Sequence, residues 1–374
     1  MPSQRFAIIG NQAFSLLNFR APLLAAIVGR GHVAYALAPD FDKESRRQVA
    51  ALGVEPIDFS LSRTGLNPLR DWADTASLVG VLRRLNLDCM LAFAIKPVIY
   101  GTLAARFAGV PRRHALIAGL GYAFGGHSVS AKQRAIHLAA KSLYRLALSQ
   151  NDTVFMQNPD DVEDFVRLGI ATREKIVRVN GTGVDLADWP IAKPVTFPVT
   201  FMLAARLLAE KGIHQFVEAA RRIRIQEPVT RFVVLGGFDS NPHGIAQADI
   251  ESWVAEGLIE SPGHVPVKPW LAQSSVFVLP SYYREGVPRS IQEAMAMGRP
   301  IITTDAPGCR ETVVEGRNGF LIPERDVDAL VMTMQRFIKQ PELIASMGRE
   351  SRKLAEERFD VTKINLVMME AMRL

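Results

Sequence analysis

Two carboxylates lie eight positions apart in the stretch YYREGVPRSIQEAMAMGRPII, residues 282–302. Glu285 precedes Pro288, which suits the first turn of a helix, and Glu293 falls within the first two turns of that helix. Carboxylates placed after a strand can hold sugar or ribose hydroxyls through charge-assisted hydrogen bonds. Alternatively, both acids face solvent beside the nearby arginines.

Two cations follow a predicted strand earlier in the chain. Arg206 and Lys211 come after the apolar run 199–205, and Gly212 precedes a helix predicted to start near Ile213. Free N–H groups and the helix dipole already favour negative charge at such a helix N-terminus. The arrangement predicts a diphosphate site, with an ordinary charged surface loop as the equal alternative.

Other motifs carry weaker signals. Gly236 and Gly237 follow a predicted strand and allow a ligand close to the backbone. The two D-x-D tripeptides, residues 40–42 and 326–328, lack the context of a metal site, and the seven histidines and two cysteines show no zinc spacing. The run IIGNQAF lacks G-x-G-x-x-G, which weakens a dinucleotide oxidoreductase interpretation. We therefore predict neither a metal nor a redox cofactor.

Composition is that of a globular protein too long for one core. The chain has 374 residues, 48% of them hydrophobic and 22% charged, which predicts two domains. Its only cysteines, Cys89 and Cys309, imply no disulfide framework and suit a reducing cytoplasm. The apolar run 21–29 is much shorter than the roughly 20 residues needed to span a bilayer. We expect a protein that is soluble or peripheral to a membrane.

Charge is distributed unevenly along the chain. No Asp or Glu occurs from Cys89 to Asn151, an interval that carries eight lysines and arginines. Within it, the helix predicted near 130–150 mixes cations with leucines, and such a helix can lie among anionic headgroups. We predict acceptor or membrane contacts for Lys96, Lys132, Arg134, Lys141 and Arg145. Two alternatives remain: a solvated basic face, and a helix that packs on the core with its cations outward.

Short apolar runs alternate with amphipathic stretches, a pattern typical of parallel sheets covered by helices on both faces. Prolines 190, 194 and 198 interrupt it and predict an extended linker within 186–198, so we expect two doubly wound α/β domains. In such domains ligands bind beyond the carboxyl ends of the strands, at the topological switch point. The predicted strands are residues 5–10, 32–39, 88–95, 114–121 and 152–158, followed by 199–205, 231–237, 275–281 and 299–305.

At this level the chain resembles the retaining glycosyltransferases of family 4. EGVPRSIQEA is similar to their E-x7-E motif, and AARLLAEKG to their Arg…Lys phosphate-binding loop. GTGVDLADW resembles the G-x-G-V-D segment that precedes their interdomain linker. APGCRETVVEGRNGFLIPERD resembles their P-G…E…G-x-N-G-F-L-x-P region. AIKPVIYGTLAARFAGVP, GLGYAF and MQNPDDVEDF resemble bacterial members that extend undecaprenyl-diphosphate-linked glycans, among them N-acetylgalactosaminyltransferases.

The resemblance implies the GT-B fold, in which two Rossmann-like domains face a cleft. We expect an acceptor-binding, membrane-facing domain at residues 1–190 and a nucleotide-sugar domain at 191–355. Residues 356–374 should form a C-terminal helix that crosses back to pack on the first domain.

The resemblance also implies roles for individual residues. Glu285 would meet the hydroxyls of the donor sugar and Glu293 the nucleotide ribose, while Arg206 and Lys211 stabilise the departing diphosphate. We expect catalysis by Arg206, Lys211 and Glu285. The predicted donor-binding set is Gly10, Gly236, Gly237, Val267, Glu285, Gly286, Val287, Pro288 and Glu293.

One position departs from the family pattern. Many members carry a histidine in the loop after the strand corresponding to HALIAG, whereas this chain has LGYAFGGH there. His127 lies six residues beyond Gly121 and substitutes only if the loop folds back. A structural glycine-rich loop is the alternative.

The expected reaction is transfer of a hexose or N-acetylhexosamine from a nucleoside diphosphate sugar, such as a UDP-sugar, with retention. The expected acceptor is a polyprenyl-diphosphate-linked glycan at the inner face of the cytoplasmic membrane. No metal and no nucleic-acid partner is expected. The alternatives are a transferase with a soluble acceptor and a non-catalytic protein that binds nucleotide sugars or nucleic acid.

Overall fold

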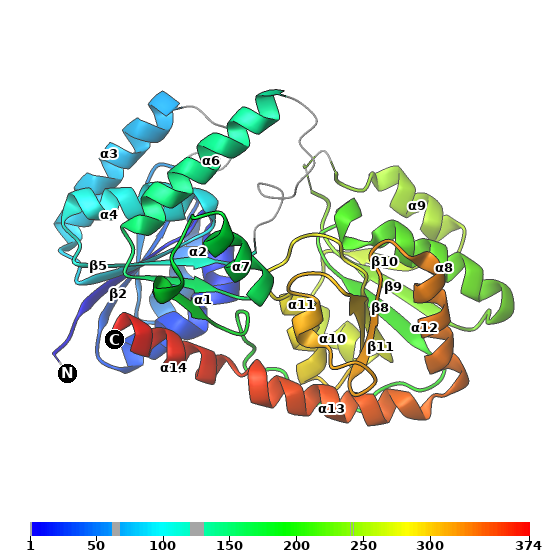
Figure 1. Ribbon diagram of the computed structural model, residues 1–374. Helices are drawn as coiled ribbons and strands as arrows, with labels where there is room; N and C mark the ends of the chain where they lie inside the picture. Colours follow the sequence, from blue (N-terminus) through cyan, green and yellow to red (C-terminus); the bar gives the residue numbers. More distant parts are fainter. Residues whose placement is uncertain (1, 62–67, 120–130, 240, 242) are drawn as a thin grey trace. The chain divides into compact units, whose positions relative to one another are not determined.

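The computed structural model describes residues 2–61, 68–119, 131–239, 241 and 243–374, though not the side chains of 68–69, 131–137 and 139–140. The chain forms two compact units (Figure 1). The first comprises residues 1–182 and 361–374, and the second residues 183–360. The first boundary precedes the proline-spaced segment because the Val184 N–H donates to the Phe359 carbonyl at 2.8 Å, within the second unit.

The first unit is built on a parallel seven-stranded sheet of order β3-β2-β1-β4-β5-β6-β7. Its strands are β1 (Arg5–Ile9), β2 (Val33–Ala38), β3 (Glu55–Asp58), β4 (Cys89–Phe93), β5 (Arg112–Ile117), β6 (Thr153–Met156) and β7 (Ile176–Arg178). Strand order reverses between β1 and β4, which places the switch point of this unit there.

Helices cover both faces of this sheet because alternate strand residues point to opposite sides. Phe6 and Ile8 pack with α1 (Ala13–Gly29), α2 (Lys43–Ala51) and α14 (Val361–Met372). Ala7 and Ile9 belong to the cluster on the other face, with α3 (Pro68–Leu85), α4 (Thr102–Ala108), α6 (Ala131–Ser149) and α7 (Pro159–Arg167). A π-helical turn, η1 (Pro97–Gly101), leads into α4.

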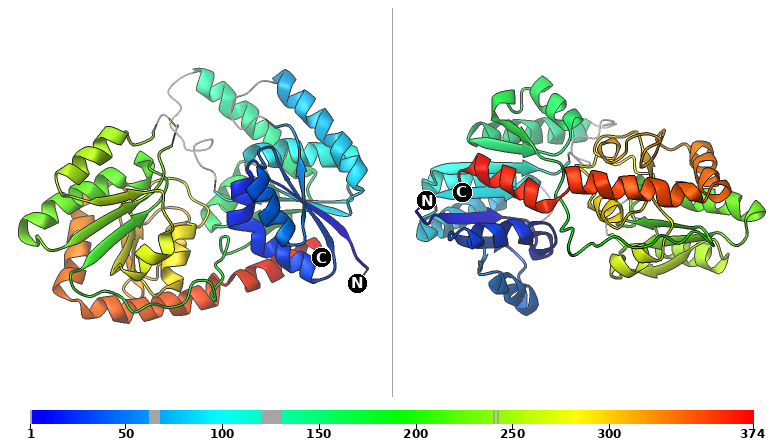
Figure 2. Two further views of the ribbon diagram at one scale, coloured as in Figure 1. Left: turned by 180° about the vertical axis from the view of Figure 1, so that it is seen from behind. Right: turned by 90° about the horizontal axis from the view of Figure 1, so that it is seen from below.

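The C-terminal helix α14 packs against α1 of the first unit (Figure 2). Ile364 and Met368 are buried in the same cluster as Leu23 and Ile27. The predicted return of the C-terminal helix to the first domain is therefore confirmed. The segment that returns to the first unit is α14 alone, which begins at Val361. The preceding helix, α13 (Glu342–Arg358), belongs to the second unit.

The second unit contains a parallel six-stranded sheet of order β10-β9-β8-β11-β12-β13, so both units have the doubly wound architecture that was predicted. Its strands are β8 (Thr200–Ala204), β9 (Arg231–Leu235), β10 (Glu260–Gly263), β11 (Val276–Leu279), β12 (Ile301–Thr304) and β13 (Gly319–Ile322). Its α-helices are α8 (Ile213–Gln226), α9 (Gln247–Ala255), α10 (Val267–Ala272), α11 (Arg289–Ala296), α12 (Val327–Lys339) and α13. Short 3-10 turns are η3 (Ala209–Lys211) and η4 (Arg310–Thr312), with η2 (Arg173–Lys175) in the first unit.

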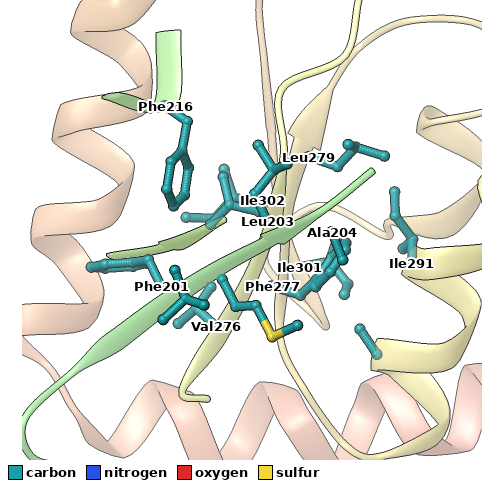
Figure 3. Packing of buried hydrophobic residues seen from close by; sticks show 14 of the residues in the cluster. Phe201, Leu203, Ala204, Phe216, Val276, Phe277, Leu279, Ile291, Ile301 and Ile302 are labelled. Atoms are coloured by element: carbon teal, nitrogen blue, oxygen red, sulfur yellow. The ribbon is translucent and has the colours of Figure 1, made fainter. Parts of the chain in front are cut away.

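The core of this sheet holds α8 and α11 in place (Figure 3). Phe216 of α8 and Ile291 of α11 lie on opposite sides of the central strands, which contribute Phe201, Phe277 and Ile301. All five of these side chains are fully buried. Burial of an aliphatic or aromatic side chain contributes about 1.5–3 kcal/mol, so the apolar face of each helix is firmly fixed to the sheet. The polar residues at the start of each helix are thereby fixed at the carboxyl edge.

Candidate active site

The second unit gathers polar side chains at the switch point of its sheet. Strand order reverses between the neighbours β8 and β11, and Lys211 and Glu285 lie in the segments that follow these two strands. The carboxyl ends of parallel strands meet at one edge, so the two segments lie side by side. Backbone hydrogen bonds join the two segments. The Glu210 carbonyl, beside Lys211, accepts from the Tyr282 N–H at 2.9 Å and from the Tyr283 N–H at 3.2 Å.

Lys211 and Glu285 form a buried ion pair. The Lys211 Nζ contacts Glu285 Oε1, and the two side chains are 11% and 12% exposed. The Ser281 hydroxyl donates to the same carboxylate oxygen at 3.1 Å, and the ammonium lies 4.9 Å from the centroid of the Tyr283 ring. Two of the three predicted catalytic residues therefore meet at one point, each oriented by further contacts.

Arg206 has a different carboxylate partner. Its Nη1 lies 2.8 Å from Oδ2 of Asp239, and 55% of its side chain is exposed. Asp239 belongs to the loop after β9. Two backbone hydrogen bonds attach this loop to the segment after β8, from the Leu207 N–H to the Gly237 carbonyl and from the Ile245 N–H to the Leu207 carbonyl. Arg206 and Lys211 thus share one loop, and each is paired with an acid from a different neighbouring loop.

Two glycines let these loops pack closely. Gly212 adopts φ +76° as the residue before α8, and a Cβ there would lie 2.2 Å from the Pro280 carbonyl oxygen. A Cβ at Gly236 would lie 2.0 Å from the Ala205 carbonyl oxygen. The close backbone approach predicted at Gly236 is thus made by the neighbouring loop of the protein itself. A Cβ at Gly237 would meet only ordinary contacts with His264, 3.7 Å away.

Helix α11 presents the second acid of the motif. Pro288 is the residue before the helix, Arg289 is its first residue, and Gly298 at φ +76° follows its end. Glu293 accepts a hydrogen bond from the Arg289 Nε at 3.0 Å. Burial raises the pKa of the Glu293 carboxyl, and the charges of Arg289 and Lys268 oppose this effect.

The remaining predicted donor-binding residues lie around these groups or in the other unit. Gly286 and Val287 occupy the loop before α11, where the Gln292 side chain donates to the Val287 carbonyl at 3.0 Å. Val267 is the first residue of α10. Gly10 follows β1 at the switch point of the first unit, and its N–H donates to the Leu37 carbonyl at 2.9 Å.

Our reading of the sequence missed four polar partners in the second unit. Ser281 and Tyr283 contact Glu285 and Lys211, and Asp239 pairs with Arg206, as described above. His243 Nδ1 lies 3.0 Å from Glu210 Oε1, and its carbonyl accepts from the Ala209 N–H. The signal for Asp239 and His243 is the run GGFDSNPHG, a polar segment placed directly after a buried strand.

The structure changes the account of the basic interval in the first unit. Lys96 lies 2.9 Å from Oδ1 of Asp71, and the two side chains are 12% and 2% exposed. The Tyr100 hydroxyl donates to the other oxygen of this carboxylate at 3.0 Å. The charge of Lys96 is thus neutralised inside the unit by an acid from outside the interval. The membrane or acceptor contact predicted for Lys96 stays a prediction, and an acceptor would have to compete with Asp71 for this ammonium group.

Helix α6 contributes the other predicted cations of this unit. Lys141 is half-buried and Arg145 is exposed, while Leu138 and Leu146 are 67% and 51% exposed. The side chains of Lys132 and Arg134, and all of residue His127, lie outside the described residues. In the part of the chain that the structure describes, no helix is long and apolar enough to cross a membrane. The same part holds no group of three or more His, Cys, Asp or Glu side chains placed to bind a metal ion.

Comparison with known proteins tests the predicted family resemblance. The model of the glycosyl transferases group 1 family matches residues 198–340. An N,N'-diacetylbacillosaminyl-diphospho-undecaprenol alpha-1,3-N-acetylgalactosaminyltransferase of Campylobacter jejuni is 27% identical over 93% of both chains. These matches confirm the predicted resemblance to the family 4 (group 1) glycosyltransferases. The chain is therefore a retaining glycosyltransferase, as the resemblance predicted.

Further relatives agree with this assignment. A colanic acid biosynthesis glycosyltransferase of Escherichia coli is 33% identical over 52% of this chain and 50% of its own. Sucrose-phosphate synthase of Thermosynechococcus elongatus superposes with a TM-score of 0.79 at 18% identity, over 99% of this chain and 98% of that one. Anabaena HepE in complex with UDP-glucose gives 0.77 at 17% identity, over 99% of both chains. These superpositions establish the GT-B fold of this glycosyltransferase.

Proposed function

We propose that this glycosyltransferase moves a hexose or N-acetylhexosamine from a UDP-sugar to a hydroxyl of a polyprenyl-diphosphate-linked glycan. The observation that carries the donor half of this proposal is the ion pair of Lys211 and Glu285 at the β8–β11 switch point. A cation and an acid held together there can bind a diphosphate and the neighbouring sugar hydroxyls at the same time.

In the proposed reaction, the bond between the anomeric carbon and the oxygen of the β-phosphate breaks. The acceptor hydroxyl forms the new glycosidic bond on the same face of the sugar, and its proton passes to the departing phosphate oxygen. Lys211 and Arg206 stabilise the negative charge that develops on the diphosphate. Because these fixed cations and the N-terminus of α8 can supply this stabilisation, the mechanism requires no metal ion.

The two glutamates bind different parts of the donor. Glu285, held by Lys211 and Ser281, accepts hydrogen bonds from hydroxyls of the transferred sugar. Glu293, four residues into α11 and paired with Arg289, accepts hydrogen bonds from the ribose hydroxyls. Gly286, Val287 and Pro288 lie in the chain between these two acids and line the diphosphate.

The acceptor half rests on the first unit and on one relative. The Campylobacter enzyme, whose name specifies an undecaprenol-linked acceptor, matches over 93% of this chain. Helix α6 carries Lys141 and Arg145 together with the exposed Leu138 and Leu146, a combination suited to anionic headgroups. We place the enzyme at the inner face of the cytoplasmic membrane, attached through this helix. A soluble glycan acceptor is the alternative.

A panel of nucleotide sugars tests the donor. A ligand that binds only the folded protein raises its melting temperature, with about 2.7 kcal/mol of stabilisation at 100 times its Kd. We expect UDP and one UDP-sugar to stabilise the protein more than the corresponding GDP compounds. No shift with any nucleotide would contradict the donor assignment.

The transfer assay uses that sugar donor with two acceptors, a polyprenyl-diphosphate-linked glycan in anionic vesicles and the same glycan without lipid. Faster transfer to the lipid-linked form supports the proposal. Equal transfer to both would favour the soluble acceptor, and donor binding without transfer to any acceptor would favour a non-catalytic binding protein.

A further inference from the structure

Arg289 and Glu293 form an ion pair on one face of α11. Arg289 Nε lies 3.0 Å from Glu293 Oε1, and the side chains are only 19% and 15% exposed. Residues four positions apart are neighbours on a helix surface, so no other element is needed to bring the two together. The pair therefore follows directly from the sequence of the helix.

The pair runs against the electrostatic preference of its own helix. Arg289 is the first residue of α11, at the positive end of the helix dipole, where acids are favoured by about 0.3–1 kcal/mol and cations are not. The first turn holds no acid. In addition, an acid placed before the cation stabilises a helix better than the reverse order that occurs here. Helix stabilisation alone does not explain why an arginine occupies this position.

Because Glu293 is buried, the ionisation of its carboxyl depends on nearby positive charge. Desolvation raises the pKa of its carboxyl, and the described charged groups that oppose this are Arg289 on α11 and Lys268 on α10. Lys268 is itself held 5.1 Å from the centroid of the Trp189 ring. Glu218 of α8 offers a contrast, because it makes the same type of ion pair with Arg222 at 2.8 Å. There the exposed surroundings leave the hydrogen bond from Arg222 dominant, and the pKa of Glu218 is lowered.

We propose that Arg289 is a positioning residue for donor binding, which keeps the Glu293 carboxylate ionised and aimed at the vicinal hydroxyls of the donor nucleoside. The inference rests on the proposed function, which assigns Glu293 to the ribose. An ionised carboxylate offers only acceptors to a diol, whereas a protonated one turns one oxygen into a donor. Hydrogen bonds to an ionised acceptor are also about twice as strong as neutral ones. Arg289 therefore acts on donor affinity through Glu293.

The test is the affinity for UDP, measured by calorimetry from pH 5.5 to pH 9. In Arg289→Gln the Glu293 carboxyl should ionise only at higher pH than in the wild type, so UDP affinity should fall about 10-fold at the acidic end of this range and recover as the pH rises; one pKa unit corresponds to a tenfold change in ionisation. Arg289→Lys retains the charge and should stay within about twofold of the wild type. Arg222→Gln, the matched control in α8, should bind UDP like the wild type at every pH.

A second readout needs no nucleotide. A carboxyl whose folded pKa is raised contributes stability at low pH, and that contribution is lost as the pH rises through the folded pKa. Removal of Arg289 raises this pKa further, so the stability deficit of Arg289→Gln should grow as the pH rises. Replacement of Glu293 by Gln in the same variant should abolish that growth.

Three outcomes separate this inference from the proposed function. A pH-independent loss of affinity in Arg289→Gln would mean direct contact with phosphate and would overturn the positioning role. Unchanged affinity in Arg289→Gln, with weakened binding in Glu293→Gln, would overturn this inference alone. Full affinity in Glu293→Gln would instead remove Glu293 from the ribose site and contradict that part of the proposed function.

Discussion

Lys211 and Glu285 meet although 74 positions separate them in the chain, since they follow strands that lie side by side at a reversal of strand order. Each side chain is almost wholly buried, and each is further held by Tyr283 or Ser281. A buried pair of this kind is costly to break, because removal of one partner leaves the other charge unpaired.

Replacement of the two cations tests their part in the reaction. Lys211→Ala and Arg206→Ala should each lower turnover by at least ~100-fold, the scale seen when a group that stabilises transition-state charge is removed. Lys353→Ala, a control at an exposed ion pair with Glu350, should leave turnover unchanged. Near-normal turnover in both folded variants would refute the assignment.

Stability distinguishes these two variants from each other. Lys211→Ala removes the cation that pairs with the buried Glu285 carboxylate and should cost about 3 kcal/mol of folding free energy. Arg206→Ala breaks a pair whose arginine is more than half exposed and should cost less than about 1 kcal/mol. Urea denaturation at neutral pH measures both values.

The two glutamates should separate in function. Glu293→Ala should weaken the binding of UDP, whereas Glu285→Ala should chiefly lower turnover and relax the choice of sugar. The reason is their placement, since Glu285 lies beside Lys211 and Glu293 lies one turn into α11. Calorimetry with UDP, combined with turnover on several UDP-sugars, measures both effects. Loss of UDP affinity in Glu285→Ala alone would reverse the two roles.

Much of this arrangement could be predicted from sequence because it follows from local patterns. The apolar runs predicted nine strands, and all nine are present within a few residues of the expected bounds. Four further strands escaped prediction: β3, β7, β10 and β13. Each has only three or four residues and lies toward an edge of its sheet, and the first three are partly exposed and lack a continuous apolar run.

The partners of the predicted residues could not be predicted in the same way. The sequence placed Lys96 in an interval without acids, but Asp71, 25 positions away on α3, neutralises it. The donors of the Arg113 guanidinium are used inside the same unit, since they bind the uncharged carbonyl groups of Val110 and Gln150. Charge counted along a chain does not reveal which cations the fold has already paired, because pairing depends on tertiary contacts.

His114 should make the first unit sensitive to acid. It is 1% exposed, neither ring nitrogen has a hydrogen-bond partner among the described residues, and burial lowers its pKa to about 4. The unfolded chain binds a proton near pH 6.5, so this histidine contributes stability above that pH that is lost as the pH falls toward 4. The loss should approach about 3 kcal/mol.

The matched variant is His114→Phe, which keeps a ring beside Phe155 without a titrating group. Its urea midpoint should fall less between pH 7 and pH 4 than that of the wild type. A control variant, His214→Phe, alters a histidine of the second unit and should leave the acid dependence unchanged. Identical pH profiles for the wild type and His114→Phe would contradict the prediction.

Attachment to anionic membranes through α6 is the last expectation. Each cation near an anionic surface contributes about 1 kcal/mol, and the attraction decays over a Debye length of ~8 Å at physiological ionic strength. The protein should therefore sediment with anionic vesicles, bind neutral vesicles less, and detach as salt rises. Replacement of Lys132, Arg134, Lys141 and Arg145 by Gln should release it without weakening UDP binding by the second unit.

The control replaces Arg47, Arg167 and Arg173, exposed cations of the same unit outside α6, and should leave sedimentation nearly unchanged. If the α6 variant and the control sediment alike, or if neutral and anionic vesicles bind equally, the cations of α6 do not anchor the enzyme.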